Sequence, residues 1–469
     1  MAYADPLYTS LPFAYTQPAA LAALGILHGL TPPAAETARV LELACASGGN
    51  VIPLAARFPR ASFTAVDIVE EEIRLAKSNA AALDLSNLTL EVADVVEFAD
   101  RPATSQFDYI IAHGLLSWAP PPVKAAVFKI CRERLSPQGL AAISFNVLPG
   151  WRAQQIVRDI LRRSVGANAP PLLRAEQAVL LLRQMASKVS NSPYGTIVRQ
   201  SAERLAEAVP SYLFSEYLAP VNEAFFFDDI VSEAQAHGLH YLTEGELPMA
   251  APETLAPESA GLVRELAAGD ALAAQTWLDK VSGRVFRRAL FAKRRGQEKP
   301  NASALAELHV SGVIQPSPQS RLAFQLESGH IVNAPNDAAA AALAEIGRAY
   351  PATIAAANSI AGANGQAMAG ALLRLAQMGG LRVSSLPLAV GRQSTSHPRV
   401  FELARQEAAR GQTWVTTLQH RSYQPPPDIL SLLAVFDGQR DRAKLSAVVG
   451  EARLTAALAT LEREALLMP

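Results

Sequence analysis

Cysteine is nearly absent from this chain of 469 residues, which contains only Cys45 and Cys131. A disulfide framework is therefore excluded as the basis of the fold, and we expect two reduced thiols in a reducing compartment. An excess of charge of one sign is also lacking, because 42 basic residues are balanced by 43 acidic ones and the formal net charge is -1. No global field then attracts the chain to nucleic acid or anionic lipid.

Long hydrophobic runs are missing as well. No segment approaches the ~18 apolar residues that a bilayer requires, and Met1–Asp5 lacks the basic residues of a signal peptide. The apolar stretch Ala19–Leu30 is interrupted by His28, so we interpret it as a buried helix. These absences predict a cytoplasmic protein without a membrane span.

Alternation of short β-rich runs with helical ones marks the first third of the chain, from Arg39 to Arg163. This pattern is typical of a parallel sheet with crossover helices. Apolar residues at helical spacing predict helices at Glu70–Leu83 and Val123–Leu135. The predicted strands are Arg39–Leu43, Ser62–Val66, Leu88–Val92, Phe107–Ile111 and Leu140–Phe145.

A different pattern follows, because the sequence from Trp151 to Ser232 is almost wholly helical. Two later strand-like runs, Leu239–Thr243 and Val285–Lys293, are expected to complete the sheet as an antiparallel pair. The polar stretch 296–304 contains breakers and predicts a linker.

The region 305–469 is rich in Ala and Leu and repeats one rhythm. Ala371–Arg382 and Ala457–Leu467 each have the pattern of an amphipathic helix that leads into a short apolar strand. This predicts two tandem winged-helix-like modules. Lysine is scarce in both segments, which disfavours binding of nucleic acid.

The most informative local pattern is Val40–Asn50, a predicted strand that leads into a turn of small residues and then a helix. Methyltransferases that use S-adenosylmethionine (SAM) commonly carry here an acidic residue and then glycines at offsets two, four and six. Glu42 and Gly48 hold the first and last positions, and Ala44 and Ala46 replace the middle glycines. Small side chains allow the main chain to approach a cofactor. Alanine costs ~1–2 kcal/mol where positive φ is needed, and a turn that binds no cofactor is the alternative.

Acidic residues also follow the second and third predicted strands. Asp67 is placed to bind the ribose hydroxyls, and Asp94 is placed near the adenine amino group. Either could be a solvated loop acid, the commoner fate of aspartate, but three acids in register after three strands favour a cofactor site.

The fourth predicted strand leaves Ala112, His113 and Gly114 at its carboxyl end, where open α/β sheets bind ligands. We expect the methyl group there, with His113 either lining the site as a catalytic candidate or serving the structure. Trp118 either lines the same site or packs the next helix. The predicted cofactor-binding residues are Glu42, Ala44, Cys45, Ser47, Gly48, Asn50, Asp67, Ile68, Ala93, Asp94, Val95, Ala112, His113 and Gly114.

The segments Tyr8–Pro18, Ser47–Asn50, Phe107–Gly114 and Ser144–Trp151 resemble bacterial class I methyltransferases with a methyltransferase regulatory domain. Some members of that family methylate lysines of outer-membrane proteins. The resemblance covers most of the chain and implies that Tyr217–Arg295 belongs to the regulatory domain. Two departures are Ala44, where the family usually has glycine, and Gln17, where it usually has histidine.

The resemblance also implies a lid, and the chemistry of lysine methylation implies an acceptor site. Tyr8, Ser10, Phe13 and Thr16 would close over the cofactor or substrate, or else form a hydrophobic strap packed on the sheet. Aromatic walls would lower the pKa of an acceptor lysine and hold the methylated ammonium. The candidates for the acceptor side are Tyr8, Tyr15, Trp118, Asn146 and Trp151, and each ring could equally belong to the core.

The sequence therefore predicts an α/β protein with a Rossmann-like seven-stranded methyltransferase domain, a helical insertion and α-rich winged-helix-like C-terminal modules. Its expected parts are a SAM-binding core with a lid (1–165), a helical insertion (166–232), a regulatory region (233–295), a linker (296–304) and the tandem modules (305–469). The expected reaction is methylation of a protein lysine by SAM without a metal. A small-molecule methyltransferase and an inactive regulatory protein are the alternatives. We expect a protein substrate and no nucleic acid, with a homodimer through the helical region as one option.

Overall fold

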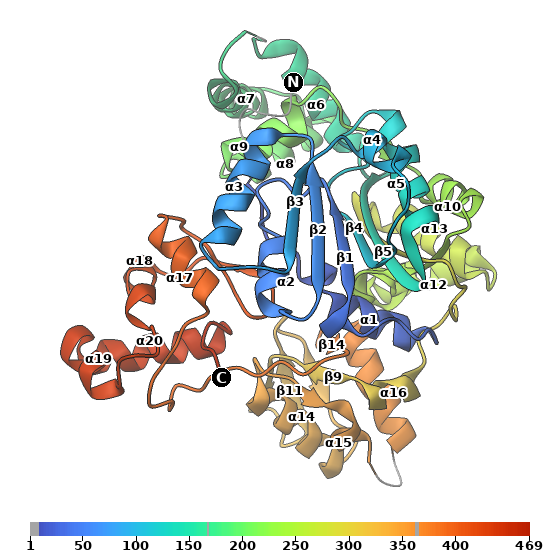
Figure 1. Ribbon diagram of the computed structural model, residues 1–469. Helices are drawn as coiled ribbons and strands as arrows, with labels where there is room; N and C mark the ends of the chain where they lie inside the picture. Colours follow the sequence, from blue (N-terminus) through green and yellow to red (C-terminus); the bar gives the residue numbers. More distant parts are fainter. Residues whose placement is uncertain (1–8, 167, 362–364) are drawn as a thin grey trace.

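A mixed β-sheet forms the centre of the protein in the computed structural model, which describes residues 9–166, 168–361 and 365–469 (Figure 1). The strand order is β3-β2-β1-β4-β5-β8-β7, and β6 pairs with β5 off this path. Strands β1 to β5 are parallel, whereas β8 is antiparallel to both β5 and β7. The predicted Rossmann-like sheet with an antiparallel pair is thus confirmed. The strands are β1 Arg39–Leu43, β2 Ser62–Asp67, β3 Leu88–Val92, β4 Phe107–Ala112, β5 Leu135–Val147, β6 Ala224–Phe225, β7 His240–Glu244 and β8 Phe286–Ala292.

Strand β5 begins five residues before its predicted start. Residues 136–139 read Ser-Pro-Gln-Gly, which is turn chemistry, but Leu135 already pairs with Phe107 of β4. A register shift between Phe107 and Tyr109 accommodates the extra residues. Sheet pairing therefore overrides the local turn signal at this point.

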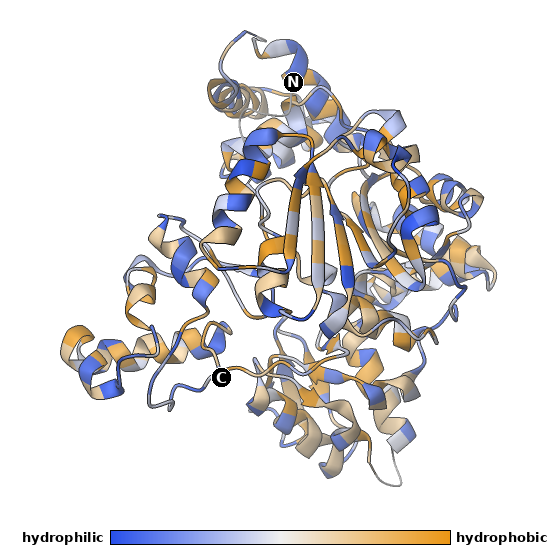
Figure 2. Ribbon diagram, viewed as in Figure 1, coloured by the Kyte–Doolittle hydropathy of each residue, from blue (hydrophilic) through white to orange (hydrophobic). Residues whose placement is uncertain are grey.

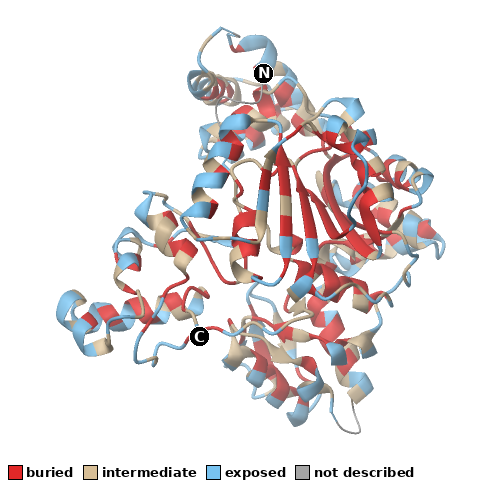
Figure 3. Ribbon diagram, viewed as in Figure 1, coloured by how far each residue is buried: buried red, intermediate tan, exposed pale blue. Residues whose placement is uncertain are grey.

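Helices cover both faces of the sheet. Successive side chains of a strand point to opposite faces, so each face has apolar side chains that a helix must bury. In β4, Tyr109 and Ile111 join the apolar cluster on one face, while Ile110 joins the cluster on the other. Figures 2 and 3 show the result, strands that are largely apolar and buried beneath helices with exposed outer surfaces. One face carries α1 Pro18–Leu27, α2 Val51–Arg57 and α3 Glu70–Ala81, and the other carries α4 Val95–Asp100, α5 Pro121–Arg134 and α10 Phe227–Ala236.

A helical lobe stands beyond the carboxyl ends of the parallel strands, at the top of Figure 1. It has an apolar core of its own, which Val157 of α6 shares with Leu182 of α7 and Leu205 of α8. The lobe thus includes α6, which the predicted border at residue 166 assigned to the core domain. Its elements are α6 Arg152–Ser164, α7 Pro171–Ala186, α8 Pro193–Leu205, α9 Pro210–Leu213 and the π-helical turn η3 Phe214–Leu218.

The predicted linker 296–304 is fixed to the core rather than free. The Gln297 amide donates to the His28 carbonyl over 2.7 Å, and the Asn301 amide donates to the Leu27 carbonyl over 2.7 Å. The His28 ring Nδ1 lies 2.7 Å from the Gln297 carbonyl oxygen. These three hydrogen bonds hold the segment against the end of α1. Between β7 and this segment lie α11 Leu247–Ala250, η4 Pro252–Thr254, α12 Pro257–Ala267 and α13 Ala271–Ser282.

Two further modules follow, drawn in orange and red in Figure 1. As the repeated rhythm predicted, a helix leads into a short strand in the first module, where α16 ends at Gln377 and β14 begins at Arg382. In the second, α20 ends at Arg463 and Leu467 bridges to Val400. The first module contains η5 Ala302–Glu307, β9 His309–Ser311, β10 Ile314–Pro316, β11 Ala323–Leu326, β12 Ile331–Asn333, α14 Asp337–Ala349, β13 Ile354–Ala355, α15 Ala356–Ile360, α16 Gly365–Gln377 and β14 Arg382–Ser384. The second contains α17 Glu402–Ala409, β15 Val415–Thr416, β16 Ser422–Tyr423, α18 Pro427–Leu430, η6 Leu433–Val435, α19 Arg442–Val449 and α20 Glu451–Arg463.

Both cysteines are buried and neither forms a disulfide. No helix in the described ranges combines the length and apolar character needed to cross a membrane.

Candidate functional site

A cavity of about 630 Å³ opens between the carboxyl ends of the parallel strands and the helical lobe. This volume lies within the range of small-molecule and cofactor sites, roughly 300–1,000 Å³. Most of the residues predicted from the sequence line it. They are Ser10, Phe13, Glu42, Ala44, Cys45, Asn50, Asp67, Ile68, Asp94, Val95, His113, Gly114, Trp118, Asn146 and Trp151.

The turn after β1 is strained at both alanine positions. Ala44 has φ 60 and Ala46 has φ 46, and Gly48 has φ 81. All three lie in the left-handed region, where a residue with a Cβ costs about 1–2 kcal/mol relative to glycine. The sequence left open whether these positions require positive φ or only a small side chain close to the cofactor. The backbone shows that both positions have positive φ. Retention of such strain is typical of functional turns.

Asp67 ties this turn to β2 and also faces the cavity. Its Oδ2 accepts from the Ala46 amide over 2.8 Å, and its Oδ1 accepts from the Val69 amide over 2.9 Å. The Ile68 amide is a third donor to this carboxylate. A carboxylate has about four acceptor sites, so Asp67 keeps capacity for a ribose hydroxyl. Burial raises the pKa of Asp67, and the backbone amides partly offset this.

Glu42 provides the test of whether the cavity fits SAM. Its Oε1 accepts from Asn50 Nδ2 over 2.9 Å, while its buried Oε2 has no hydrogen-bond partner within the described ranges. Burial raises the pKa of Glu42 to about 8. An unpaired carboxylate oxygen beside a turn of small residues fits the amino group of SAM, because a buried acceptor requires a donor.

Asp94 and Ile68 lie where the adenine was expected. Asp94 caps α4 by accepting from the Val96 amide over 2.7 Å, and it also lines the cavity. Ile68 lines the cavity with 55% of its surface exposed, which is unusual for so apolar a side chain. An apolar face beside a carboxylate suits a heteroaromatic ring with an exocyclic amino group.

His113 lines the cavity as a neutral ring. Its Nδ1 lies 2.7 Å from the Tyr15 hydroxyl oxygen, and its ring centroid lies 3.6 Å from that of Phe13. Burial, with a smaller effect from Arg288, lowers the pKa of His113 to about 3. Such a weak base takes no proton from an alkylammonium at neutral pH. Tyr15 lies behind His113 and does not line the cavity as a wall.

The amino-terminal segment packs against the turn. Ser10 Oγ accepts from the Gly49 amide over 2.8 Å, and the Phe13 amide donates to Asn50 Oδ1 over 3.0 Å. A Cβ at Gly49 would lie 2.2 Å from the Ser10 carbonyl oxygen, so only glycine permits this approach. Tyr8 lies outside the described residues.

Besides Tyr15, five of the predicted site residues do not line the cavity. Thr16 is buried behind it and contacts Asn50 Oδ1 over 2.9 Å. Ala93 and Ala112 are buried in the apolar cluster beneath the sheet. Ser47 and Gly48 close the turn, in which the Gly48 amide donates to the Cys45 carbonyl.

The part of the cavity nearest the lobe contains residues that sequence reasoning missed. Tyr212, Phe214 and Glu216 come from α9 and η3, and they line the cavity together with Trp118 and Trp151. Their only sequence signal was two aromatic rings and an acid within five residues of a helical region. The missed lining residues are Ala46, Val69, Glu72, Leu115, Ala119, Pro120, Val123, Tyr212, Phe214, Ser215, Glu216, Ala219, Val285, Phe286 and Arg288.

Glu216 is held in a defined position. Arg158 Nη1 donates to the Glu216 carbonyl over 3.1 Å and Nη2 donates to the Ala219 carbonyl, so one buried guanidinium fixes the backbone of the π-helical turn. Burial raises the pKa of Glu216 to about 7, although Arg158 and Asn222 act in the opposite direction. The Trp151 Nε1 is buried without a partner among the described atoms. Within the described ranges, no three His, Cys, Asp or Glu residues gather as a metal site.

Comparisons with known proteins agree with this geometry. Residues 40–139 match the family described as a methyltransferase domain, 209–293 match a predicted methyltransferase regulatory domain, and 396–465 match the PKMT C-terminal winged helix domain. The chain thus contains a methyltransferase domain, and its similar solved structures include SAM-dependent methyltransferases. SAM is the cofactor that this domain implies.

Two solved structures are similar to this chain over nearly its whole length. PKMT2 from Rickettsia typhi superposes with a TM-score of 0.85 at 21% identity, over 98% of this chain and 100% of that one. The same protein in complex with S-adenosylhomocysteine (AdoHcy) gives 0.84 at 22% identity, over 98% and 99%. At this identity the likeness shows a shared fold.

Two curated relatives come from Rickettsia prowazekii (strain Madrid E). The uncharacterized protein RP789 is 33% identical over 291 residues, which are 61% of this chain and 52% of that protein. The uncharacterized protein RP028 is 29% identical over 237 residues, or 50% and 94%. The chain thus spans about half the length of RP789.

Proposed function

We propose that this methyltransferase transfers the methyl group of SAM to the side-chain amine of a protein lysine. The observation that carries the proposal is the composition of the cavity. Besides the cofactor turn, the cavity is lined by Trp118, Trp151 and Phe214 and by the carboxylate-bearing residue Glu216. Aromatic rings with one acid suit an aliphatic chain that ends in an ammonium group. The match to a PKMT winged helix domain, where PKMT denotes protein lysine methyltransferase, supports the same acceptor class.

The cofactor is held by residues of the strand ends in this proposal. Glu42 Oε2 would accept from the amino group of SAM, the remaining acceptor capacity of Asp67 would bind the ribose, and Asp94 with Ile68 would hold the adenine. When bound, SAM supplies a methyl group on a positively charged sulfur. Alignment of such a group with its acceptor contributes about 7–11 kcal/mol to catalysis.

The acceptor lysine must lose its proton before it reacts, since its pKa in water is about 10.4. The rings of Trp118 and Trp151 remove water from the amine and lower its pKa. Glu216 attracts the ammonium and accepts its proton, for which a pKa of about 7 is well placed. SAM would supply the methyl group for the freed nitrogen lone pair, and its sulfur would keep the electron pair of the broken carbon–sulfur bond.

Labelled SAM, incubated with the full chain and bacterial extract, tests this proposal. Label on protein, mapped to N-methyl lysine by mass spectrometry, is the expected result. Glu216→Gln should lower kcat by about 10²- to 10⁴-fold and leave AdoHcy affinity unchanged. Glu203→Gln, at an exposed acid of α8, is the matched control and should behave like the wild type. Equal activity of both variants would remove Glu216 from the mechanism.

A small-molecule acceptor is the second candidate, because a cavity of about 630 Å³ is large enough for SAM and a small amine. Label in the small-molecule fraction alone, with none on protein, would establish that alternative.

A further inference from the structure

The winged helix module contacts the core domain close to the cofactor turn. Its strands β15 and β16 form a hairpin with the loop Thr417–Arg421. Arg57 of α2 donates to the Leu418 carbonyl over 2.7 Å, and Gln17 Nε2 donates to the Gln419 carbonyl over 3.0 Å. Arg57 also donates to the Gln17 side-chain oxygen. Two core side chains therefore hold the main chain of the loop.

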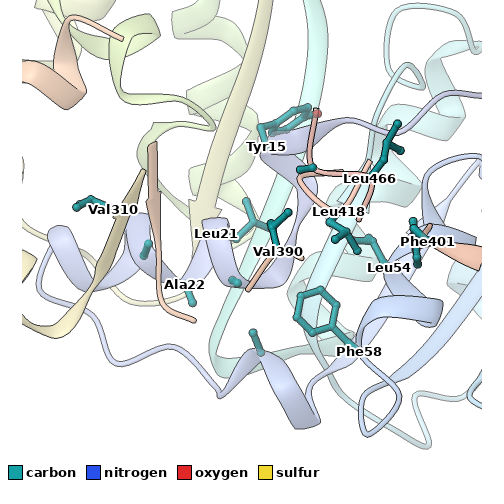
Figure 4. Close-up of a cluster of buried hydrophobic side chains, with 14 of the residues drawn as sticks. Tyr15, Leu21, Ala22, Leu54, Phe58, Val310, Val390, Phe401, Leu418 and Leu466 are labelled. Carbon is teal, nitrogen blue, oxygen red and sulfur yellow. The ribbon is translucent and has the colours of Figure 1, made fainter. Parts of the chain in front are cut away.

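Apolar packing extends this contact. Leu418 and Phe401 lie beside Leu54 of α2, and Phe58 at the end of α2 lies below them (Figure 4). These residues belong to one continuous buried cluster that also contains α1. The module thus packs on the face of the sheet that α1 and α2 cover.

His420, at the tip of the hairpin loop, contacts the turn itself. It is buried, and its Nε2 lies 2.8 Å from Asn50 Oδ1. The Phe13 amide, which can only donate, faces the same atom over 3.0 Å, so this atom is the amide oxygen and not the nitrogen. His420 Nε2 must then carry a proton and donate. The Thr16 hydroxyl also lies 2.9 Å from this oxygen, but it donates to the Phe13 carbonyl over 2.8 Å, which leaves the second lone pair for His420. Asn50 Nδ2 in turn donates to Glu42 Oε1 over 2.9 Å.

We propose that His420 is a positioning residue for SAM: through Asn50 it orients Glu42, whose free oxygen binds the amino group of the cofactor. The hydrogen bonds form one chain from the winged helix module to the cavity wall. His420 lies 370 positions after Asn50 in the sequence, so the carboxyl-terminal module completes a site built by the amino-terminal domain.

The conformation and charge of His420 agree with this role. Its backbone has φ 57, a left-handed conformation that histidine and asparagine adopt more readily than most residues. Burial, together with the nearby Arg57, lowers the pKa of His420 to about 3. The ring is therefore neutral over the physiological range and acts as a hydrogen-bond donor, not as a charge. By reciprocity, a bound cofactor strengthens the docking of the module.

Two substitutions separate positioning from a purely structural role. His420→Gln places an amide nitrogen near the position of Nε2 but tolerates positive φ less well. His420→Asn suits positive φ but is too short to donate to Asn50. A positioning role predicts AdoHcy affinity near the wild-type value for Gln and about tenfold weaker for Asn, whereas a role of the loop backbone alone predicts the reverse order.

The measurement is calorimetric titration of the full chain with AdoHcy, joined by KM for SAM and kcat. We expect a raised KM with little change in kcat at saturating SAM for His420→Asn. His397→Asn, at an exposed histidine of the same module, should bind like the wild type. Wild-type affinity of His420→Asn, or loss in both the Gln and Asn variants, would overturn the proposal. The readout does not depend on the acceptor, so the absence of lysine methylation would leave this inference intact.

Discussion

Replacement of Ala44 or Ala46 by glycine should stabilise the protein. Both residues have positive φ, 60 and 46, and carry a Cβ that opposes this conformation. Removal of the Cβ strain adds about 1–2 kcal/mol to the free energy of unfolding. The greater freedom of glycine in the unfolded chain lowers it by about 0.4–1 kcal/mol. The net expectation is about 1 kcal/mol of added stability at each position.

Thermal unfolding followed by calorimetry measures this effect. For a unit of 150–250 residues, about 1 kcal/mol raises the melting temperature by roughly 2–4 °C, here in the transition that includes the central sheet. Two controls frame the result. Ala268→Gly, at an exposed helix end with φ 48, should stabilise without changing AdoHcy affinity, and Ala56→Gly, inside α2, should destabilise by about 1 kcal/mol.

The reasoning would be refuted by a specific combination of results. If Ala268→Gly raises the melting temperature but Ala44→Gly and Ala46→Gly leave it unchanged or lower it, the strain assigned to the cofactor turn does not exist. A simultaneous loss of AdoHcy binding would show instead that the two methyl groups contact the cofactor.

Three other predictions concern charge and assembly. Burial raises the pKa of Glu42 to about 8, and the ammonium group of the cofactor favours the ionised carboxylate. AdoHcy affinity should therefore increase with pH by up to about tenfold per pH unit below about 8 and stay constant above it. Calorimetric titrations of Glu42→Gln should show no such pH dependence. Arg287 is fully buried between Glu244 and Asp279, so Arg287→Met should lower the free energy of unfolding by about 3–5 kcal/mol in urea titrations, and a loss below 1 kcal/mol would contradict a paired role. If the helical region pairs two chains, Leu180→Glu on the exposed face of α7 should convert a sedimenting dimer into a monomer; a wild-type chain that sediments as a monomer disproves the pairing.

Local patterns predicted the sheet well. The bounds of β1 and β3 agree with the sequence prediction, and β2 and β4 extend it by one residue. Alternating or wholly apolar runs specify such strands through their two faces, and the acids that follow them mark one edge of a parallel sheet. The same logic placed Glu42, Asp67 and Asp94 at the cavity.

Contacts that depend on tertiary folding could not be predicted in this way. Glu216 enters the cavity from a π-helical turn whose position is fixed by Arg158, and neither feature has a periodic signal. His420 is distant in sequence from Asn50 and looks like an ordinary loop histidine. Thr16 was expected at the cavity as a lid residue, but its hydroxyl instead contacts Asn50 from the buried side.

The central claim is that the cavity beside the strained turn holds SAM, and calorimetric titration of the full chain with AdoHcy tests it most directly. The account predicts saturable binding at a single site per chain, displaced by SAM. No binding at millimolar AdoHcy, with the chain folded and the calorimeter verified, would contradict it.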